Sequence, residues 1–196
     1  MLKMNALFAQ NLLASKKPNL KDTQKISDFL DSFCKKITKS YIDNDKSKIY
    51  FNANRYTNMQ SKDFYNLSLK DSSFDNLTAL ECSCNAVHID DFIHIKKDKV
   101  AHIALMFLIW VGDFLQKKFS DYAFCIITSI ETDYDIDKKI APPFCLTNRL
   151  NLKFHIIREN EDYLFEDLDS YLYDAIAVYQ TTRLLERKAQ SQPIKN

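Results

Sequence analysis

The hydrophobic pattern is dominated by one run, from Val100 to Leu115, in which nearly every residue is apolar. At about 100° per residue, positions 103–111 place bulk on every side of a helix, which is tolerated only where other elements cover it. The run therefore predicts a buried central helix, with Asp98 as its N-cap. One edge is less apolar and should approach the surface; it carries His102, Asp113, Gln116 and Lys117, interrupted by Met106 and Ile109.

Apolar residues recur at the helical period of about 3.6 in four other segments. The clearest pattern predicts an amphipathic helix from Asp22 to Asn44. A long final helix is predicted from Asp162 to Lys188, because a broad apolar face runs between an acidic start and a basic end that suit the helix dipole. Shorter helices are expected over 1–17 and 72–80.

Strands are predicted where apolar and polar residues alternate. We expect a first hairpin from 49–53 and 65–69, a strand at 92–96, and two long strands at 122–131 and 150–157 that pair with each other. Alternatively the central helix begins at Asp90, and the strand at 92–96 is then absent.

Together these elements predict a single α+β domain over residues 1–189, followed by a flexible C-terminal tail at 190–196. An antiparallel sheet of four or five strands should pack on the buried central helix, with amphipathic helices near both ends of the chain. The chain has 196 residues, enough to bury such a core without a metal or a disulfide. The pattern leaves the strand order open.

Glycine occurs only once, at Gly112 inside the central helix. Phosphate-cradling loops need several glycines so that backbone N–H groups can approach the anion, and a dinucleotide fingerprint and a P-loop are therefore excluded. The 27 basic and 26 acidic residues nearly cancel, so no overall field would steer the chain to nucleic acid or an anionic membrane. No cofactor is expected.

The central run is the best candidate for a membrane span, but it is too short and is interrupted by His102 and Asp113. Near the N-terminus, Asn5 and Asn11 break the apolar core that a secretory signal needs. Five cysteines, an odd number, then indicate free thiols in a reducing compartment. We predict a cytoplasmic protein without a membrane span, and the lysine-rich, glycine-poor composition is typical of an AT-rich microbial or viral genome.

Soft metal ligands gather in one stretch, at Cys82, Cys84, His88 and His94. Zinc needs four converging ligands, and structural sites usually contain cysteine pairs separated by two to four residues. A single residue separates Cys82 from Cys84. We therefore favour buried thiols and hydrogen-bonded histidines over a metal site.

The sequence does not indicate a histidine and a carboxylate close enough to act together as an acid–base pair. His102 and Asp113 share an edge of the central helix but lie ~16 Å apart along it, and His155 is expected to face solvent from its strand. The alternative function is therefore a small hydrolase or metal-dependent enzyme with a dispersed site. It would combine His88, His94, His102 or His155 with Cys82 or Cys84.

Tyrosines beside asparagines predict a contact surface for another protein. Tyr50, Asn52, Asn54 and Tyr56 share one face of the expected hairpin, and Tyr173 should point away from the apolar face of the final helix. Such residues offer aromatic area and hydrogen bonds together. We predict a non-catalytic protein-binding protein, such as an adaptor, a secretion chaperone, or an inhibitor or immunity factor. The buried central helix is not expected to take part.

Overall fold

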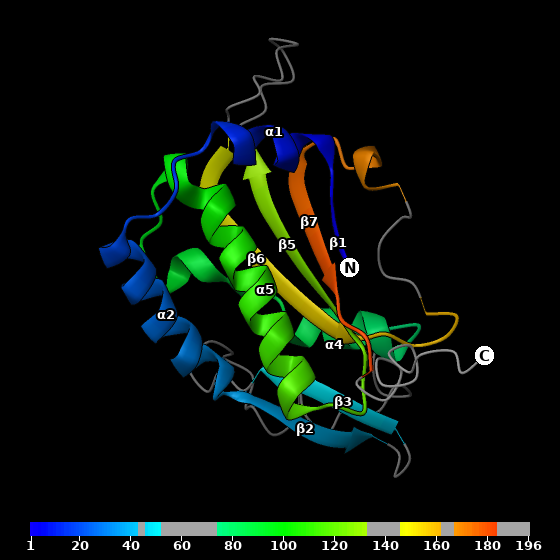
Figure 1. The fold of residues 1–196 in the computed structure, drawn as a ribbon. Helices are drawn as coiled ribbons and strands as arrows, with labels where there is room; N and C mark the ends of the chain where they lie inside the picture. Colours follow the sequence, from blue (N-terminus) through cyan, green and yellow to red (C-terminus); the bar gives the residue numbers. More distant parts are fainter. Residues whose placement is uncertain (43–45, 52–73, 133–145, 162–166, 184–196) are drawn as a thin grey trace, which may run out of the picture.

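The computed structural model describes residues 1–42, 46–51, 74–132, 146–161 and 167–183, and for 38–42 and 46–51 it describes the backbone alone (Figure 1). The helices are α1 (Ala6–Ala14), α2 (Leu20–Cys34), α4 (Leu77–Cys84) and α5 (Val100–Lys118), with short 3-10 turns η2 (Ile89–Asp91), η3 (Lys97–Lys99) and η5 (Leu168–Ser170). The strands are β1 (Leu2–Met4), β2 (Ile37–Ile42), β3 (Lys46–Phe51), β4 (Val87–His88), β5 (Phe124–Thr132), β6 (Leu146–Ile156) and β7 (Asp174–Gln180).

Five strands form one antiparallel sheet in the order β1-β7-β5-β6-β4. The predicted pairing of the two long strands is confirmed, because β5 runs antiparallel to β6 from Phe124 opposite Ile156 to Thr132 opposite Leu146. A separate antiparallel hairpin is formed by β2 and β3. The chain is an α+β protein with a five-stranded antiparallel sheet, as the apolar pattern predicted.

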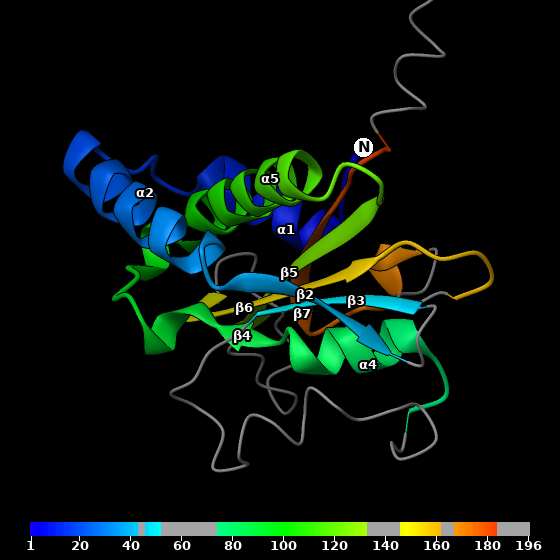
Figure 2. The ribbon, with the colours of Figure 1, turned by 90° about the horizontal axis from the view of Figure 1, so that it is seen from below.

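Helices cover both faces of the sheet, with α1, α2 and α5 on one side and α4 on the other (Figure 2). The central helix α5 crosses the sheet and packs on β5, and its fully buried Phe107 and Leu108 join Phe124 and Ile126 in the main core. Alternate strand residues point the other way, and Cys125, Ile127, Ile176 and Val178 form a second, smaller cluster. The sheet therefore buries apolar residues on both faces.

The predicted final helix is wrong for residues 174–180, which form β7 between β1 and β5. Ala175 and Ala177 belong to the core on the α5 side, whereas Ile176 and Val178 belong to the cluster on the opposite face. A strand buried on both faces loses its alternation, so its apolar residues also fit a helical stripe. The prediction is also wrong for 167–173, where the 3-10 turn η5 is the only helical part, and for 181–183; residues 162–166 and 184–188 lie outside the described residues.

The amphipathic helix expected to reach Asn44 ends at Cys34, and the chain continues into β2. The first hairpin is consequently β2–β3, over 37–51, rather than 49–69. Strand pairing with β3 outweighs the helical spacing of this segment. The expected second strand at 65–69 lies outside the described residues.

Two further predictions for the middle of the chain need correction. Residues 92–96 form no strand, and the short strand β4 precedes them. The N-cap of α5 is Lys99 rather than Asp98, because η3 occupies the residues before the helix. At the N-terminus, residues 2–4 are a strand, and the helix begins after Asn5. None of the helices in the described part of the chain has the length and apolar composition that a membrane crossing requires.

Candidate functional site

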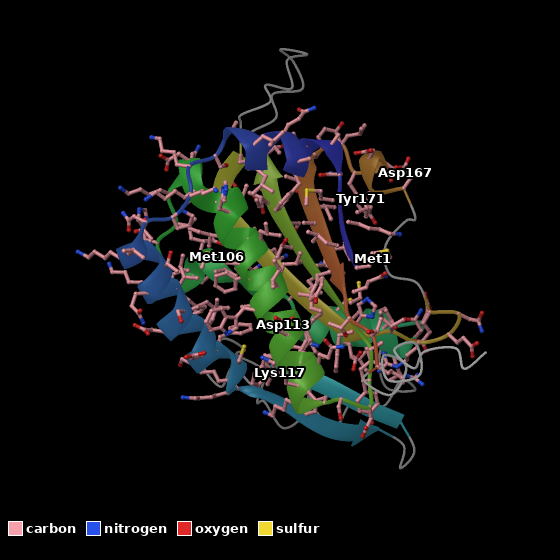
Figure 3. The ribbon with its side chains drawn as sticks, in the orientation of Figure 1. Met1, Met106, Asp113, Lys117, Asp167 and Tyr171 are labelled. Carbon is pink, nitrogen blue, oxygen red and sulfur yellow. The ribbon has the colours of Figure 1, made fainter. Side chains whose placement is uncertain are left out.

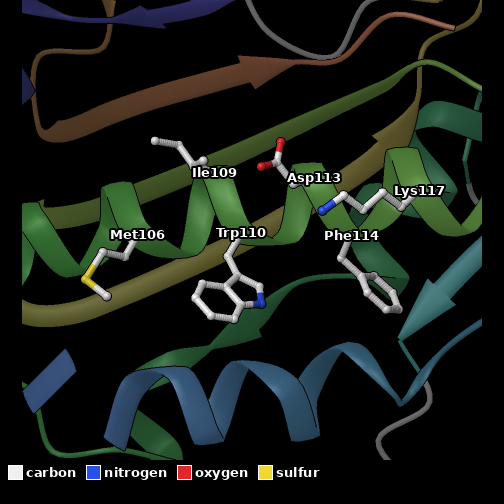
Figure 4. Close-up of a pocket in the computed structure, with 6 residues that line it drawn as sticks. All are labelled: Met106, Ile109, Trp110, Asp113, Phe114 and Lys117. Atoms are coloured by element: carbon white, nitrogen blue, oxygen red, sulfur yellow. The ribbon is translucent and has the colours of Figure 1, made fainter. Parts of the chain in front are cut away.

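The outer face of α5 carries a hollow of about 510 Å³. Its described lining comes from one helix, at Met106, Ile109, Trp110, Asp113, Phe114 and Lys117 (Figures 3 and 4). These positions follow the i, i+3, i+4 spacing of one helical stripe, so their side chains lie along a single face. We call this surface the α5 face.

Two large apolar side chains of the α5 face remain in contact with solvent. Ile109 is 41% exposed and Trp110 is 37% exposed, although both belong to the most apolar segment of the sequence. Figure 4 shows Met106, Trp110 and Phe114 on the side facing α2, and Ile109 on the side facing β7. Adjoining apolar side chains of this size at a surface mark an interaction site more often than isolated ones do.

Polar groups flank the apolar side chains at one end of the face. The hydroxyl of Tyr179 on β7 donates to Oδ1 of Asp113 over 3.4 Å. Lys117 makes no hydrogen bond or ion pair with the described residues, and Figure 4 shows its side chain extending along the helix towards Asp113. Lys118 is anchored instead, because its Nζ donates to the carbonyl of Ile37 over 2.7 Å. Lys117 is therefore available to pair with an acid on a partner.

This arrangement corrects the expectation that the apolar sides of the central helix are fully buried, because Trp110 is 37% exposed. The expectation that the helix takes no part in binding stays untested. The less apolar edge was recognised from Met106, Ile109, Asp113 and Lys117. Trp110 was missed because it lies next to that edge within an unbroken apolar run. The sequence did contain a signal for its exposure, because the charged residues Asp113 and Lys117 share the helix edge next to Trp110.

The structure does not bring the predicted partner-binding residues into one described surface. Asn52, Asn54 and Tyr56 lie outside the described residues, and for Tyr50 the structure gives the backbone of β3 alone. Tyr173 is 54% exposed but precedes a strand rather than lying on a helix. The beginning of β7 lies beside α1, at the opposite end of the molecule from the β2–β3 hairpin (Figure 1). Their role in binding stays a prediction.

The candidate metal ligands occupy different environments. Cys82 is fully buried in α4, where burial raises the pKa of its thiol, and Cys84 is half-buried. His88 is exposed on β4, and His94 is exposed in the connection before α5. Within the described ranges, no three His, Cys, Asp or Glu side chains are placed to hold one metal ion.

A buried polar cluster lies between α4 and β6. Glu81 is fully buried, and its Oε2 accepts hydrogen bonds from the N–H of Ile156 and from Nη1 of Arg158, both at 2.8 Å. His155 was expected to face solvent but is buried, 5% exposed, opposite Cys125 in the sheet register. Both faces of the sheet are covered, so alternation does not put this histidine at the surface. Its burial lowers its pKa, which favours the neutral imidazole.

Residues 5–191 match the model of a protein family described as the Uncharacterized protein PM0498 family. The chain belongs to this family. The matched span contains every described element except β1 and therefore includes the α5 face. No curated protein and no solved structure matches the chain.

Proposed function

We propose that this chain is a non-catalytic protein-binding protein whose partner lies along the α5 face. The observation that carries the proposal is the exposure of both Trp110 and Ile109, which are adjacent in the sequence and line the two sides of a hollow of about 510 Å³. Tryptophan is among the residues that contribute most to binding when they become desolvated at the centre of an interface. A solvent-exposed tryptophan in a shallow hollow supplies such an anchor.

The shape of the face favours a helical segment as the occupant. From Met106 to Lys117 the stripe spans about 16 Å, or roughly three helical turns. A partner helix with apolar residues at the same i, i+3, i+4 spacing would interlock with it along this length. The partner should carry an acidic residue that reaches Lys117, because this ammonium has no partner in the described structure.

The surroundings of the face support a protein partner over nucleic acid. Among its described lining residues one lysine is balanced by one aspartate, so the face lacks the basic groove that tracks a phosphate backbone. The free thiols of Cys34, Cys82, Cys84 and Cys125 support work in the cytoplasm. We therefore propose that the chain is an adaptor, a secretion chaperone, or an inhibitor or immunity factor.

Site-specific photocrosslinking tests the proposal. A photoreactive amino acid placed at Trp110 in the native cell should form a discrete adduct with a protein, identified by mass spectrometry. The same amino acid at Asp28, exposed on α2, provides the control. The purified adduct partner should then bind the purified chain, and its crosslinked peptide should be an amphipathic helix. Equal adducts from both positions, or a partner that fails to bind when purified, would contradict the proposal.

A further inference from the structure

A second cavity, of about 310 Å³, lies where the first turns of α2 and α5 meet the connection at 93–96. We call it the lysine cavity, because Lys25, Lys96 and Lys99 all line it. Its volume falls at the lower end of the range for small-molecule pockets, about 300–1,000 Å³. It shares no lining residue with the α5 face.

The wall of this cavity towards the core is apolar. Ile26, Ile95 and Ile103 line it, and each is at most 4% exposed. They come from α2, from the connection and from α5, so three separate elements fix the shape of the wall. A ligand seated here would place an apolar body against branched aliphatic side chains.

The charged groups of the cavity do not cancel. Nζ of Lys99 lies 2.5 Å from Oδ2 of Asp22, and this bond holds the pKa of Asp22 below its usual range. The same oxygen accepts from the backbone N–H of Asn19 at 3.4 Å, so the carboxylate is already engaged. Lys25 and Lys96 make no hydrogen bond or ion pair with the described residues. Among the described lining residues three lysines face one aspartate, which leaves an excess of two positive charges, although Lys96 also lies near enough to Asp22 and Asp98 to lower the pKa values of both carboxyls.

We propose that the lysine cavity binds a small organic phosphomonoester. A phosphomonoester carries a charge of about −1.5 to −2 at neutral pH, which matches the excess of two positive charges on the described lining, where Lys25 and Lys96 make no hydrogen bond or ion pair with described residues. Its organic part would lie on the isoleucine wall, burying apolar surface that inorganic phosphate lacks. His94 also lines the cavity, but the surrounding lysines disfavour a divalent cation there.

Methyl NMR of the full chain, labelled at isoleucine, tests this site. Phenyl phosphate should shift the methyl signals of Ile26, Ile95 and Ile103 in a saturable manner. Inorganic phosphate should bind at least about fivefold more weakly because it leaves the apolar wall uncovered, and benzyl alcohol should not saturate because it lacks the charge.

Substitutions separate the site from general charge attraction. Lys25→Gln and Lys96→Gln should each weaken phenyl phosphate binding about fivefold or more, since each removes a charge-assisted contact. Lys35→Gln, an equal charge change at the other end of α2, should leave the affinity unchanged. Unliganded methyl spectra establish that each variant is folded. Equal weakening by Lys35→Gln, equal affinity for inorganic phosphate, or shifts confined to isoleucines outside the cavity lining, which is formed by Ile26, Ile93, Ile95 and Ile103, would overturn the proposal.

Discussion

The ring of Tyr179 on β7 lies directly against the backbone of Gly112 on α5. A Cβ atom at position 112 would stand 2.4 Å from Cδ1 and 2.6 Å from Cε1 of that ring. The single glycine of the chain therefore permits the central helix to approach β7, and the Tyr179 hydroxyl then reaches Asp113 at the edge of the α5 face. Helix, strand and proposed binding surface are joined at this contact.

Gly112→Ala should lower the free energy of unfolding by about 1–2 kcal/mol, because the overpacking cost exceeds the helix-propensity gain of about 1 kcal/mol. In a Tyr179→Ala background the main obstacle is gone and only Cδ1 of Ile126, 3.2 Å from the added Cβ, has to move slightly, so Gly112→Ala should become close to neutral. Urea unfolding of the four proteins measures both values. The same destabilisation in both backgrounds would show that Tyr179 is not what excludes a side chain at position 112.

Asn5 should matter more for stability than an ordinary helix cap. Its buried Oδ1 accepts from the N–H of Phe8 at 2.9 Å and of Ile176 at 3.0 Å, and its Nδ2 donates to the carbonyl of Asp174 at 2.8 Å. Asn5→Ala should cost about 2–4 kcal/mol, since a cap is lost and buried groups on β7 lose their partner. The solvent-exposed cap Asn19 is the control, and Asn19→Ala should cost about 1 kcal/mol. Equal losses in denaturant titrations would contradict the bridging role.

The Glu81–Arg158 pair should contribute far more to the free energy of unfolding than a surface ion pair does. Glu81→Ala leaves the guanidinium of Arg158 largely buried without its carboxylate, and should cost about 3–5 kcal/mol. Arg149→Ala breaks the exposed pair with Glu131 and should cost less than about 1 kcal/mol. Chemical unfolding of both variants gives the comparison. A loss below about 1 kcal/mol for Glu81→Ala would show that the cluster is not tightly held.

His155 should make the protein less stable in mild acid. Burial lowers its folded-state pKa, so its contribution is complete above the unfolded pKa of about 6.5 and is lost as the pH falls. Between pH 7.5 and 5.5 the expected loss is about 1 kcal/mol for this group. His102, whose pKa burial also lowers, adds a loss of the same sign.

The test therefore compares variants rather than the wild type alone. The change in unfolding free energy between the two pH values should be smaller by about 1 kcal/mol in His155→Gln, whereas His88→Gln, exposed on β4, should retain the wild-type change. A His155→Gln variant with an unchanged pH dependence would mean that the imidazole ionises freely in the folded protein.

Much of the fold follows from local patterns of the sequence. Val100 to Lys118 is helical because its apolar residues surround the axis, and β5 and β6 pair because their alternating residues share the main core. β7 was not recognised, since both of its faces are buried and period two is lost. The sequence analysis assigned the residues of β2 to the preceding helix, because the pairing of β2 with β3 depends on tertiary structure and not on the local pattern.

The candidate sites were harder to predict than the fold. The exposure of Trp110 depends on which side of α5 the sheet covers. That side depends on the strand order, which the hydrophobic periodicity of the sequence does not reveal. The lysine cavity unites Lys25 with Lys96, residues from separate elements that no local motif connects. His94 was considered as a metal ligand, whereas the cavity that it lines also contains lysines from α2, from the connection before η3 and from η3 itself.

The affinity of Trp110→Ala for the purified partner tests the central claim most directly. Calorimetric titration, at a temperature well below the variant's thermal midpoint, should show a loss of about 2 kcal/mol or more, roughly thirtyfold in Kd. The midpoint itself should fall, because the indole is only 37% exposed and its buried part loses packing. Tyr173→Ala, also exposed but at the beginning of β7, serves as the matched aromatic control and should bind as the wild type does. Unchanged affinity in Trp110→Ala, with weakened binding in Tyr173→Ala, would contradict the account and move the interface to the tyrosine surface.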